Sequence, residues 1–278
     1  MSKERLYIFD TTLRDGAQTQ GVDFSLEDKE KIASTLDNLG VDYIEAGWPG
    51  ANPTDTEFFQ KKHNFKNSKL TSFGMTKKSG RSAENDTGLS AIMNSSTSAV
   101  CLVGKSWDFH VDIALGVTNE ENLNNIAESA KHFVKAKKEF MFDAEHFFDG
   151  YKANPKYALS CLKAAYDQGA RWVILCDTNG GTLPHEVSRI VNEVTKVIPG
   201  KNLGIHAHND TGNAVANSLA AVLSGVRQIQ GTINGLGERC GNANLISLIP
   251  TFFLKKDFSS QFEIGIKSEN IKNLTDCS

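Results

Sequence analysis

Two histidines stand one residue apart near the end of an apolar segment, GIHAHND, at residues 204–210. In an extended chain alternate side chains share a face, so His206 and His208 point the same way with their imidazoles close together. Imidazole nitrogens are common ligands of divalent metals. Two such histidines also fit a half-exposed strand end, so the metal-ligand interpretation depends on what lies beside them.

Polar side chains follow several other apolar segments. They lie in DTTLRDG (residues 10–16), DAEH (143–146), DTN (177–179) and the glycine-rich stretch NGLGERCGNAN (234–244), which carries Glu238, Arg239, Asn242 and Asn244. A carboxylate, two imidazoles and amide oxygens make a mixed oxygen and nitrogen ligand set suited to Mg²⁺, Mn²⁺ or Zn²⁺. Because this set contains no thiolate, a structural zinc site is disfavoured.

Some of these residues have two interpretations. Arg14 could form only a surface ion pair with Asp15, or it could grip a carboxylate and stabilise a developing oxyanion. Glu145 could simply cap the following helix. Cys240 has no basic residue close in sequence that would favour its thiolate, so a nucleophilic role is disfavoured. The glycines of residues 234–244 lack a following G-K-[ST], so they indicate a tight turn rather than a phosphate cradle.

The elements that must position these residues alternate between strands and helices. Short apolar or β-branched runs predict eight strands, at residues 6–10, 42–47, 70–74, 99–104, 140–145, 172–177, 203–208 and 229–235. Helical spacing predicts helices within residues 25–40, 154–169 and 183–200, the first capped by Ser25 and ended by Gly40. Eight such units in ~250 residues predict a parallel (β/α)₈ TIM barrel, whose active site lies at the C-terminal ends of the strands.

Composition narrows the function classes. The 278 residues are 40% hydrophobic and 23% charged, which is typical of a globular protein. A net charge of −3 disfavours nucleic acid as a partner. The five cysteines are odd in number and include no C-x-x-C pair, so free thiols in a reducing cytoplasm are expected. No apolar run approaches the ~20 residues that cross a bilayer, so no membrane partner is expected.

Six segments together resemble a known family. FDTTLRDGAQTQG, EAGWPGANPTD, FDAEHFFDGY, LCDTNGGTLP, GIHAHNDTGNAVANS and GLGERCGNANL are similar to the DRE-TIM metallolyase family, in particular the synthases of 2-isopropylmalate, homocitrate and citramalate. The resemblance covers essentially the whole chain. Within it, EHFFDGY and CDTNGG look most like bacterial citramalate synthases.

The resemblance implies an acyltransferase that performs a metal-dependent Claisen-type condensation. Acetyl-CoA would be the co-substrate, a 2-oxoacid the acceptor, and CoA would be released; pyruvate, giving citramalate, is favoured. By similarity, the divalent cation (Mn²⁺, Mg²⁺ or Zn²⁺) would be bound by Asp15, His206, His208 and Asn242. A homodimer is also implied.

The resemblance assigns four further residues. Arg14 would bind the substrate and neutralise the alkoxide that forms at the keto carbon, and Thr178 would hold the substrate carboxylate. Glu145 would orient or move protons near the attacking methyl group, and Gln18 would lie on the acyl-CoA side.

The resemblance also predicts the domain organisation. Residues 1–265 would form the catalytic barrel, and residues 266–278 would begin a C-terminal subdomain. In the family such subdomains bring acid/base residues over the partner subunit's barrel mouth. The chain is therefore expected to bind a metal and pyruvate but to turn over slowly.

Three alternatives stay open. The chain could be a 2-isopropylmalate or homocitrate synthase, an HMG-CoA-lyase or aldolase-like enzyme of the same barrel, or a non-catalytic barrel that binds a metabolite. The choice of 2-oxoacid is not determined by the sequence, because one methylene in an apolar pocket is worth only ~1–3 kcal/mol.

Overall fold

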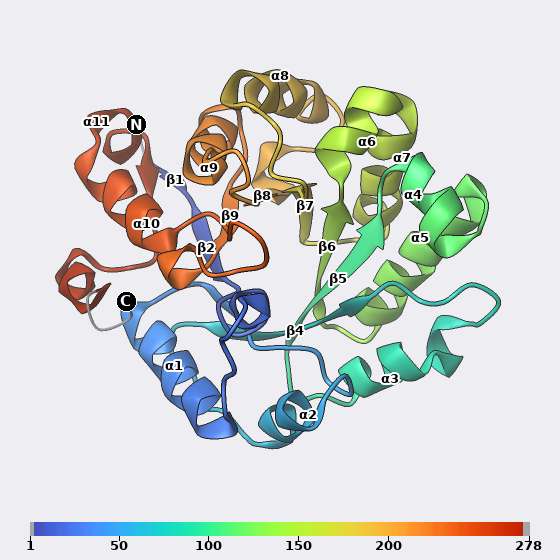
Figure 1. Ribbon diagram of the computed structural model, residues 1–278, viewed down its shortest axis with the longest axis horizontal. Coiled ribbons are helices and arrows are strands. Elements are labelled where there is room, and N and C mark those ends of the chain that lie inside the picture. The colour runs from blue at the N-terminus through green and yellow to red at the C-terminus, as the bar shows by residue number, and fades with distance from the viewer. Residues whose placement is uncertain (1–2, 275–278) are drawn as a thin grey trace.

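The computed structural model describes residues 3–274, and its centre is a closed barrel of parallel strands (Figure 1). In barrel order the strands are β2 (Tyr7–Asp10), β3 (Tyr43–Glu45), β4 (Lys69–Met75), β5 (Ala99–Lys105), β6 (Glu139–Glu145), β7 (Trp172–Asp177), β8 (Leu203–Ala207) and β9 (Gln228–Gly231). Each of the eight predicted strands overlaps one of these, and β9 pairs with β2 to close the ring. The predicted (β/α)₈ TIM barrel is confirmed.

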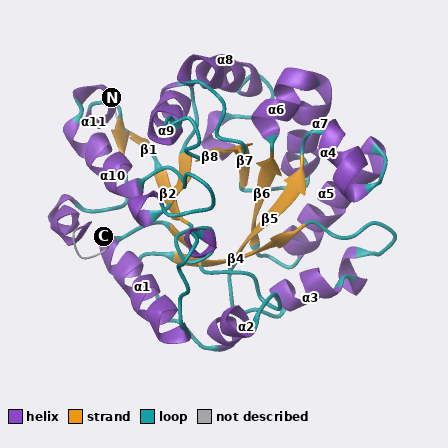
Figure 2. Ribbon diagram, in the orientation of Figure 1, coloured by secondary structure: helices purple, strands orange, loops and turns teal. Residues whose placement is uncertain are grey.

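Helices surround the strands on the outside of the barrel (Figure 2). They are α1 (Leu26–Leu39), α2 (Pro53–Gln60), α3 (Thr87–Met93), α4 (Asp108–His110), α5 (Asn119–Lys135), α6 (Phe147–Ala153), α7 (Pro155–Tyr166), α8 (Pro184–Val194), α9 (Ala214–Leu223), α10 (Leu245–Leu254) and α11 (Lys256–Ser259). Short 3₁₀ or π turns lie at 16–18, 83–85, 111–115, 200–202, 233–235 and 268–273. Within residues 3–274, none of the helices has the length and apolar character needed to span a membrane.

Local sequence signals explain where the predicted helices begin and end. Ser25 caps α1 and forms a reciprocal capping box with Asp28, while Gly40 ends the helix in the left-handed conformation at φ 97°. The predicted helix at 154–169 is α7, capped by Asn154. The helix predicted at 183–200 is shorter than expected, because α8 ends at Val194 and turns lead from there to Pro199.

Most of the barrel interior beneath the mouth is apolar. Phe9, Tyr43, Met141 and Trp172 are buried there, and the Trp172 indole donates a hydrogen bond of 3.0 Å to the Tyr43 hydroxyl. Cys101 and Cys176 belong to this interior and Cys161 to the layer between strands and helices, so all three pack as buried thiols. Cys240 is exposed, and Cys277 lies outside the described residues. The polar side chains of the candidate site lie at the other, C-terminal ends of the strands.

A small second sheet was missing from the sequence prediction. β1 (Glu4–Arg5) pairs in parallel with β10 (Phe262–Glu263), which ties the two ends of the barrel domain together. Two-residue strands carry too little periodicity to be recognised in a sequence. After β10, Ile266 and Leu274 are buried in the outer core and the Asn270 side chain donates to backbone carbonyls of α1. The boundary expected at residue 265 stays a prediction, and residues 275–278 of the segment after it lie outside the described part.

Candidate metal centre

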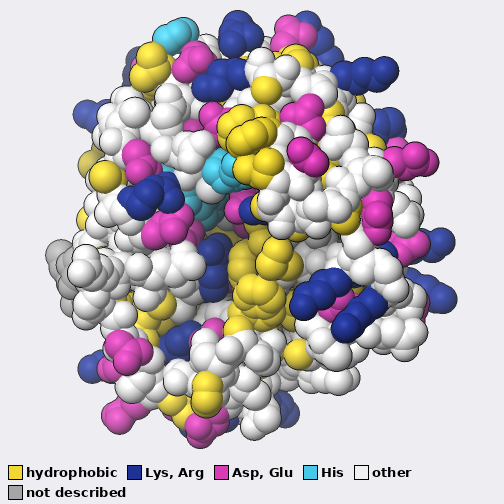
Figure 3. Space-filling model, turned by 45° about the vertical axis from the view of Figure 1, so that its right-hand side comes forward, with side chains coloured by type: hydrophobic (Ala, Val, Ile, Leu, Met, Phe, Trp, Pro, Cys, Tyr) yellow, Lys and Arg dark blue, Asp and Glu magenta, His cyan; other side chains and the backbone are white. Residues whose placement is uncertain are grey.

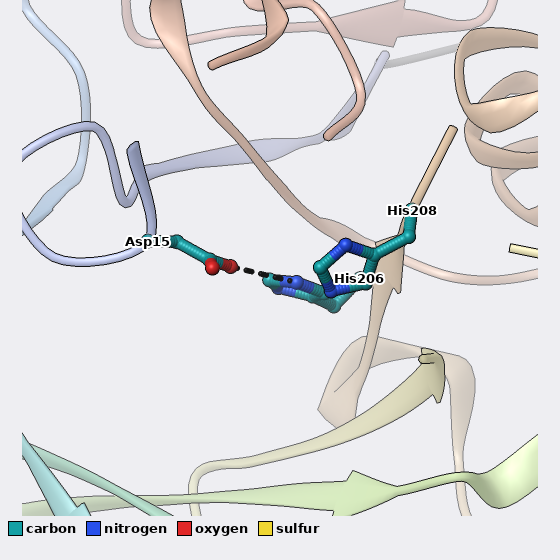
Figure 4. A group of neighbouring side chains, drawn as sticks. All are labelled: Asp15, His206 and His208. Atoms are coloured by element: carbon teal, nitrogen blue, oxygen red, sulfur yellow. Dashed lines mark ion pairs between the residues drawn. The ribbon is translucent and has the colours of Figure 1, made fainter. Parts of the chain in front are cut away.

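Three predicted ligands meet at the mouth of the barrel. Asp15 lies in the turn after β2, His206 lies within β8, and His208 follows β8 (Figure 4). His206 Nε2 is 3.1 Å from Asp15 Oδ2, and the centroids of the two imidazole rings are 5.1 Å apart. One ligand atom from each of the three residues lies within 4.8 Å of the other two. All three residues are at most 5% exposed, so little water reaches their donor atoms.

Hydrogen bonding around these residues leaves lone pairs without donors. His206 Nδ1 lies 2.8 Å from the side-chain oxygen of Gln230, which can only accept, so Nδ1 carries a proton. With that proton alone, His206 Nε2 and Asp15 Oδ2 present lone pairs to each other, which requires a second proton or a cation between them. His208 Nδ1 also has no hydrogen-bond partner although it is buried. This donor set therefore fits a divalent cation.

Asn242 is placed beside the same group. Its backbone bridges to His208 in antiparallel fashion, and its side-chain amide nitrogen donates 2.9 Å to Leu236 O. This bond leaves the buried side-chain oxygen of Asn242 as a free acceptor. The loop needs glycine at two points: a Cβ on Gly237 would lie 2.1 Å from the Asn242 amide nitrogen, and one on Gly241 would lie 2.1 Å from Gly235 O. The glycines thus make a tight turn, as expected, and this turn presents Asn242.

The charges of the three residues differ in the metal-free protein. Burial alone would raise the pKa of Asp15, but Arg14 and His206 outweigh it and hold that pKa well below its usual range. Burial would lower the pKa of His206, yet the contact with Asp15 raises it to about 8. Burial and the neighbouring His206 lower the pKa of His208 to about 3, so His208 is neutral near pH 7. The site therefore holds an ionised carboxylate, one neutral imidazole and one imidazole that shares a proton with Asp15.

Arg14 is part of a buried ion pair, not of a surface one. Its Nε lies 2.7 Å from Glu45 Oε2, its Nη1 lies 3.5 Å from Asp15 Oδ1, and its guanidinium lies 4.0 Å from the centre of the Phe73 ring. Thr11 donates a hydrogen bond of 2.6 Å to the same Glu45 oxygen. Sequence reasoning missed Glu45, although it is the last residue of β3 and hence a carboxylate at the mouth.

The predicted substrate residue Thr178 and the predicted catalytic residue Glu145 lie at the ends of neighbouring strands. Thr178 follows β7, and its hydroxyl oxygen accepts a hydrogen bond of 2.8 Å from the backbone N–H of His146, which leaves the hydroxyl proton available for a ligand. Glu145 ends β6 and pairs with Lys105 at 2.5 Å. Glu145 does not cap α6, because the N-cap residue of that helix is His146.

Gln18 lies in the same turn as Asp15, whose backbone carbonyl accepts a hydrogen bond of 3.0 Å from the Gln18 N–H. It is exposed and lines a cleft of about 490 Å³ that also contacts Arg14, Trp48 and Phe73. Figure 3 shows one face of the molecule, hollowed near its middle, with histidine side chains on the wall of the hollow and a strip of apolar side chains beside them. Gln18 and Arg14 both line the cleft, and neither His206 nor His208 does.

Arg239 links three loops of the barrel mouth through hydrogen bonds. Arg239, in the loop after β9, binds both carboxylate oxygens of Asp210 at 2.8 and 3.0 Å and donates 2.6 Å to the carbonyl of Thr178. Its backbone is in the left-handed region at φ 54°, which is uncommon for a residue other than glycine. The sequence placed Arg239 at the mouth without assigning it a role.

Two further carboxyl groups of the barrel are buried, Asp10 at the end of β2 and Asp143 in β6. Burial raises the pKa of Asp10 to about 7, although Thr12 donates hydrogen bonds to it from its backbone and its hydroxyl. Burial and the charge of Glu45 also raise the pKa of Asp143. Gln230 lies between Asp143 and His206, with its side-chain nitrogen 3.2 Å from Asp143 Oδ1. Sequence reasoning missed Gln230 as a partner of the site.

A closed parallel barrel with carboxylate, imidazole and arginine groups at its C-terminal mouth defines this chain as a (β/α)₈ barrel with a candidate metal centre. The family model described as HMGL-like matches residues 5–275, and the chain belongs to this family.

Relatives agree with this membership. The chain is 55% identical to an (R)-citramalate synthase of Aquifex aeolicus (strain VF5) over 275 residues, which cover 98% of this chain and 51% of the relative. It is 34% identical to 2-isopropylmalate synthase 1 of Caldanaerobacter subterraneus subsp. tengcongensis, over 98% of this chain and 68% of the relative. The chain spans about half the length of the curated citramalate synthases it matches.

Solved structures share the fold. The HMG-CoA lyase of Bacillus subtilis superposes with a TM-score of 0.82 at 18% identity, covering 100% of this chain and 93% of the lyase. At this identity the similarity shows the barrel and not the reaction.

Proposed function

We propose that this chain is the catalytic barrel of an enzyme that condenses acetyl-CoA with pyruvate to give citramalate and CoA. The observation that carries the proposal is the identity of 46–55% to five (R)-citramalate synthases over more than nine-tenths of the chain. The arrangement at the mouth supports it, since Asp15, His206 and His208 lie together there and Arg14 pairs with Asp15.

Asp15, His206, His208 and Asn242 would hold the divalent cation. When bound, Mn²⁺, Mg²⁺ or Zn²⁺ would act as a Lewis acid on the keto group of the 2-oxoacid. The unpartnered lone pairs of Asp15, His208 and Asn242 support this assignment.

Arg14 and Thr178 would bind and polarise the oxoacid. Arg14 keeps its positive charge beside Glu45 and Asp15, so it would neutralise the oxyanion that develops at the keto carbon. The Thr178 hydroxyl, whose oxygen accepts from the His146 N–H, would donate a hydrogen bond to the substrate carboxylate.

The condensation requires a carbon nucleophile. The acetyl methyl group loses a proton to a base, its carbon forms a bond to the keto carbon, and the former keto oxygen takes up a proton. Water then cleaves the thioester and releases the CoA thiol, which makes the reaction irreversible. Glu145, paired with Lys105 at the end of β6, would orient or move protons near the methyl group. Gln18, in the cleft next to Arg14, would lie on the acyl-CoA side.

The domain and partner assignments belong to the same proposal. Residues 1–265 would be the catalytic barrel, and the chain from residue 266 would begin a C-terminal subdomain. The functional unit would be a homodimer that acts on small molecules in the cytoplasm, without nucleic acid or membrane partners. A 2-isopropylmalate synthase is the second candidate, supported by 34% identity to such an enzyme.

A calorimetric titration and a thiol-release assay test the proposal. With Mn²⁺ present, pyruvate should bind, and thiol release from acetyl-CoA should be slow but faster with pyruvate than with 2-oxoisovalerate. Reactions without oxoacid correct for the exposed thiol of Cys240. The proposal fails if pyruvate does not bind in the presence of Mn²⁺, or if 2-oxoisovalerate is the better acceptor.

A further inference from the structure

Gln230 contacts both a metal ligand and a buried carboxylate. It lies in β9, beside His206 in the parallel pairing of β8 and β9, and is 1% exposed. Its side-chain oxygen is 2.8 Å from His206 Nδ1, and its side-chain nitrogen is 3.2 Å from Asp143 Oδ1. The same nitrogen is 3.5 Å from the side-chain oxygen of Gln228.

These neighbours determine which end of the Gln230 amide faces His206. The oxygens of Asp143 and Gln228 accept hydrogen bonds, so the NH₂ group of Gln230 must face them. The amide oxygen is then directed at His206, and the imidazole can bond to it only by donating from Nδ1. Reversing the amide would bring its oxygen against two other oxygen acceptors in a buried site, which is costly.

We infer that Gln230 is a positioning residue that keeps the proton of His206 on Nδ1, so that Nε2 presents its lone pair toward Asp15 and a divalent cation. The inference rests on the proposed metal centre. It adds the tautomer of His206, which the four ligand assignments do not specify. Partners that fix the ring of a metal-binding histidine typically affect metal affinity by ~10–100-fold.

The side-chain amide of Gln230 suits its position beside His206 because it carries no charge. Asp143, Glu45 and Cys101 already bring three ligand-type side chains within 4.8 Å of one another in the same buried region. A neutral acceptor fixes the imidazole without adding a carboxylate to this cluster. Gln230 thus separates His206 from Asp143, which would otherwise compete with Asp15 as its partner.

The wild-type chain provides the first test. Long-range ¹H–¹⁵N spectra of the metal-free protein at pH 9.5, where a neutral imidazole carries one proton, show which ring nitrogen of His206 carries it. The His206 signals are assigned by their loss in His206→Gln. We expect the proton on Nδ1, and a proton on Nε2 would overturn the inference without requiring any variant at position 230 to fold.

Variants provide the second test. Gln230→Met removes the acceptor and should populate both tautomers and raise the Mn²⁺ dissociation constant ~10–100-fold. Tyr43→Phe is the matched control, because it removes a buried polar atom of the barrel interior that accepts a hydrogen bond of 3.0 Å from Trp172 and lies outside the proposed metal centre.

Equal Mn²⁺ affinity and equal tautomers in Gln230→Met and Tyr43→Phe would overturn the inference. Failure of the metal centre has a different signature, since the wild type would then bind no Mn²⁺ while its His206 proton still lies on Nδ1.

Discussion

Arg14 and Glu45 form a buried ion pair at the barrel mouth, with 2.7 Å between Nε and Oε2. The Glu45 side chain is fully buried, and its second oxygen has no hydrogen-bond partner among the described residues. Glu45 therefore holds one edge of the guanidinium, and Asp15 lies next to another nitrogen at 3.5 Å. Arg14, which would neutralise the oxyanion, is thus held between Glu45 and the candidate metal ligand Asp15.

Replacing Glu45 with Gln should damage both stability and substrate binding. Removing one partner of a buried ion pair costs ~3–5 kcal/mol of unfolding free energy, because the other charge is left uncompensated. Arg14 would also lose its orientation, so pyruvate affinity should fall. Asp42→Asn is the control, because Asp42 pairs with Arg5 at the other end of β3, 2.5 Å apart. Calorimetry with pyruvate and Mn²⁺ separates the two variants; equal pyruvate affinity in both would show that Glu45 is only structural.

Mn²⁺ affinity should rise with pH up to about 8 and then level off. The proton shared by His206 and Asp15 competes with the cation, and the pKa of His206 is raised to about 8. The pKa of His208, about 3, lies far below this range. Electron paramagnetic resonance of free Mn²⁺ between pH 6 and 9 measures the affinity. An affinity that does not change over this range would contradict the assigned charge of His206.

The stability of the metal-free protein should show the opposite trend. A group whose pKa is raised in the folded state contributes stability below its unfolded pKa of ~6.5, and this contribution is lost as the pH rises through the folded value. For His206 the folded value is about 8. Urea denaturation of the wild type and of His206→Gln at pH 6 and pH 9 isolates the effect, and the difference between the two proteins should shrink at pH 9.

Arg239→Lys should loosen the mouth with little loss of stability. A lysine cannot make the bidentate contact with Asp210 while also reaching the Thr178 carbonyl. Because the Arg239 side chain is 40% exposed, the ion pair itself contributes only ~0–1 kcal/mol to folding. Weaker Mn²⁺ and pyruvate binding is expected at an almost unchanged melting temperature. Arg227→Lys, which alters a pair with Glu4 away from the metal ligands, should leave both affinities unchanged.

Thr178→Val should weaken pyruvate binding about 10- to 100-fold, the equivalent of ~1.5–3 kcal/mol for a hydrogen bond to a charged group. Thr178→Ser keeps the hydroxyl and should bind pyruvate nearly as well as the wild type. Mn²⁺ affinity without pyruvate should be unaffected in both variants. If the valine variant binds pyruvate as tightly as the serine variant, Thr178 does not hold the substrate carboxylate.

The sequence carries most of the barrel because its strands are nearly continuous apolar runs, as in WVILCD of β7, where all six residues are buried. It also indicates the candidate ligands, since Asp15, His206 and His208 lie at or just beyond strand ends and Asn242 lies in the glycine-rich loop after β9. Glu45 lies inside the strand predicted at residues 42–47, so its position in the sequence does not mark it as a residue of the barrel mouth. Gln230 contacts His206 only because β8 and β9 pair in one register, and that register is a property of the folded barrel. The early end of α8 and the two-residue strands β1 and β10 depend on tertiary packing in the same way.

A crystal structure of the chain grown with Mn²⁺ tests the central claim most directly, through an anomalous difference map recorded at the manganese edge. The account predicts one strong peak between the Asp15 carboxylate and the imidazoles of His206 and His208, with the Asn242 side-chain oxygen on the same side of the mouth. A map without a peak at that position, or with manganese bound only elsewhere on the barrel, would contradict it.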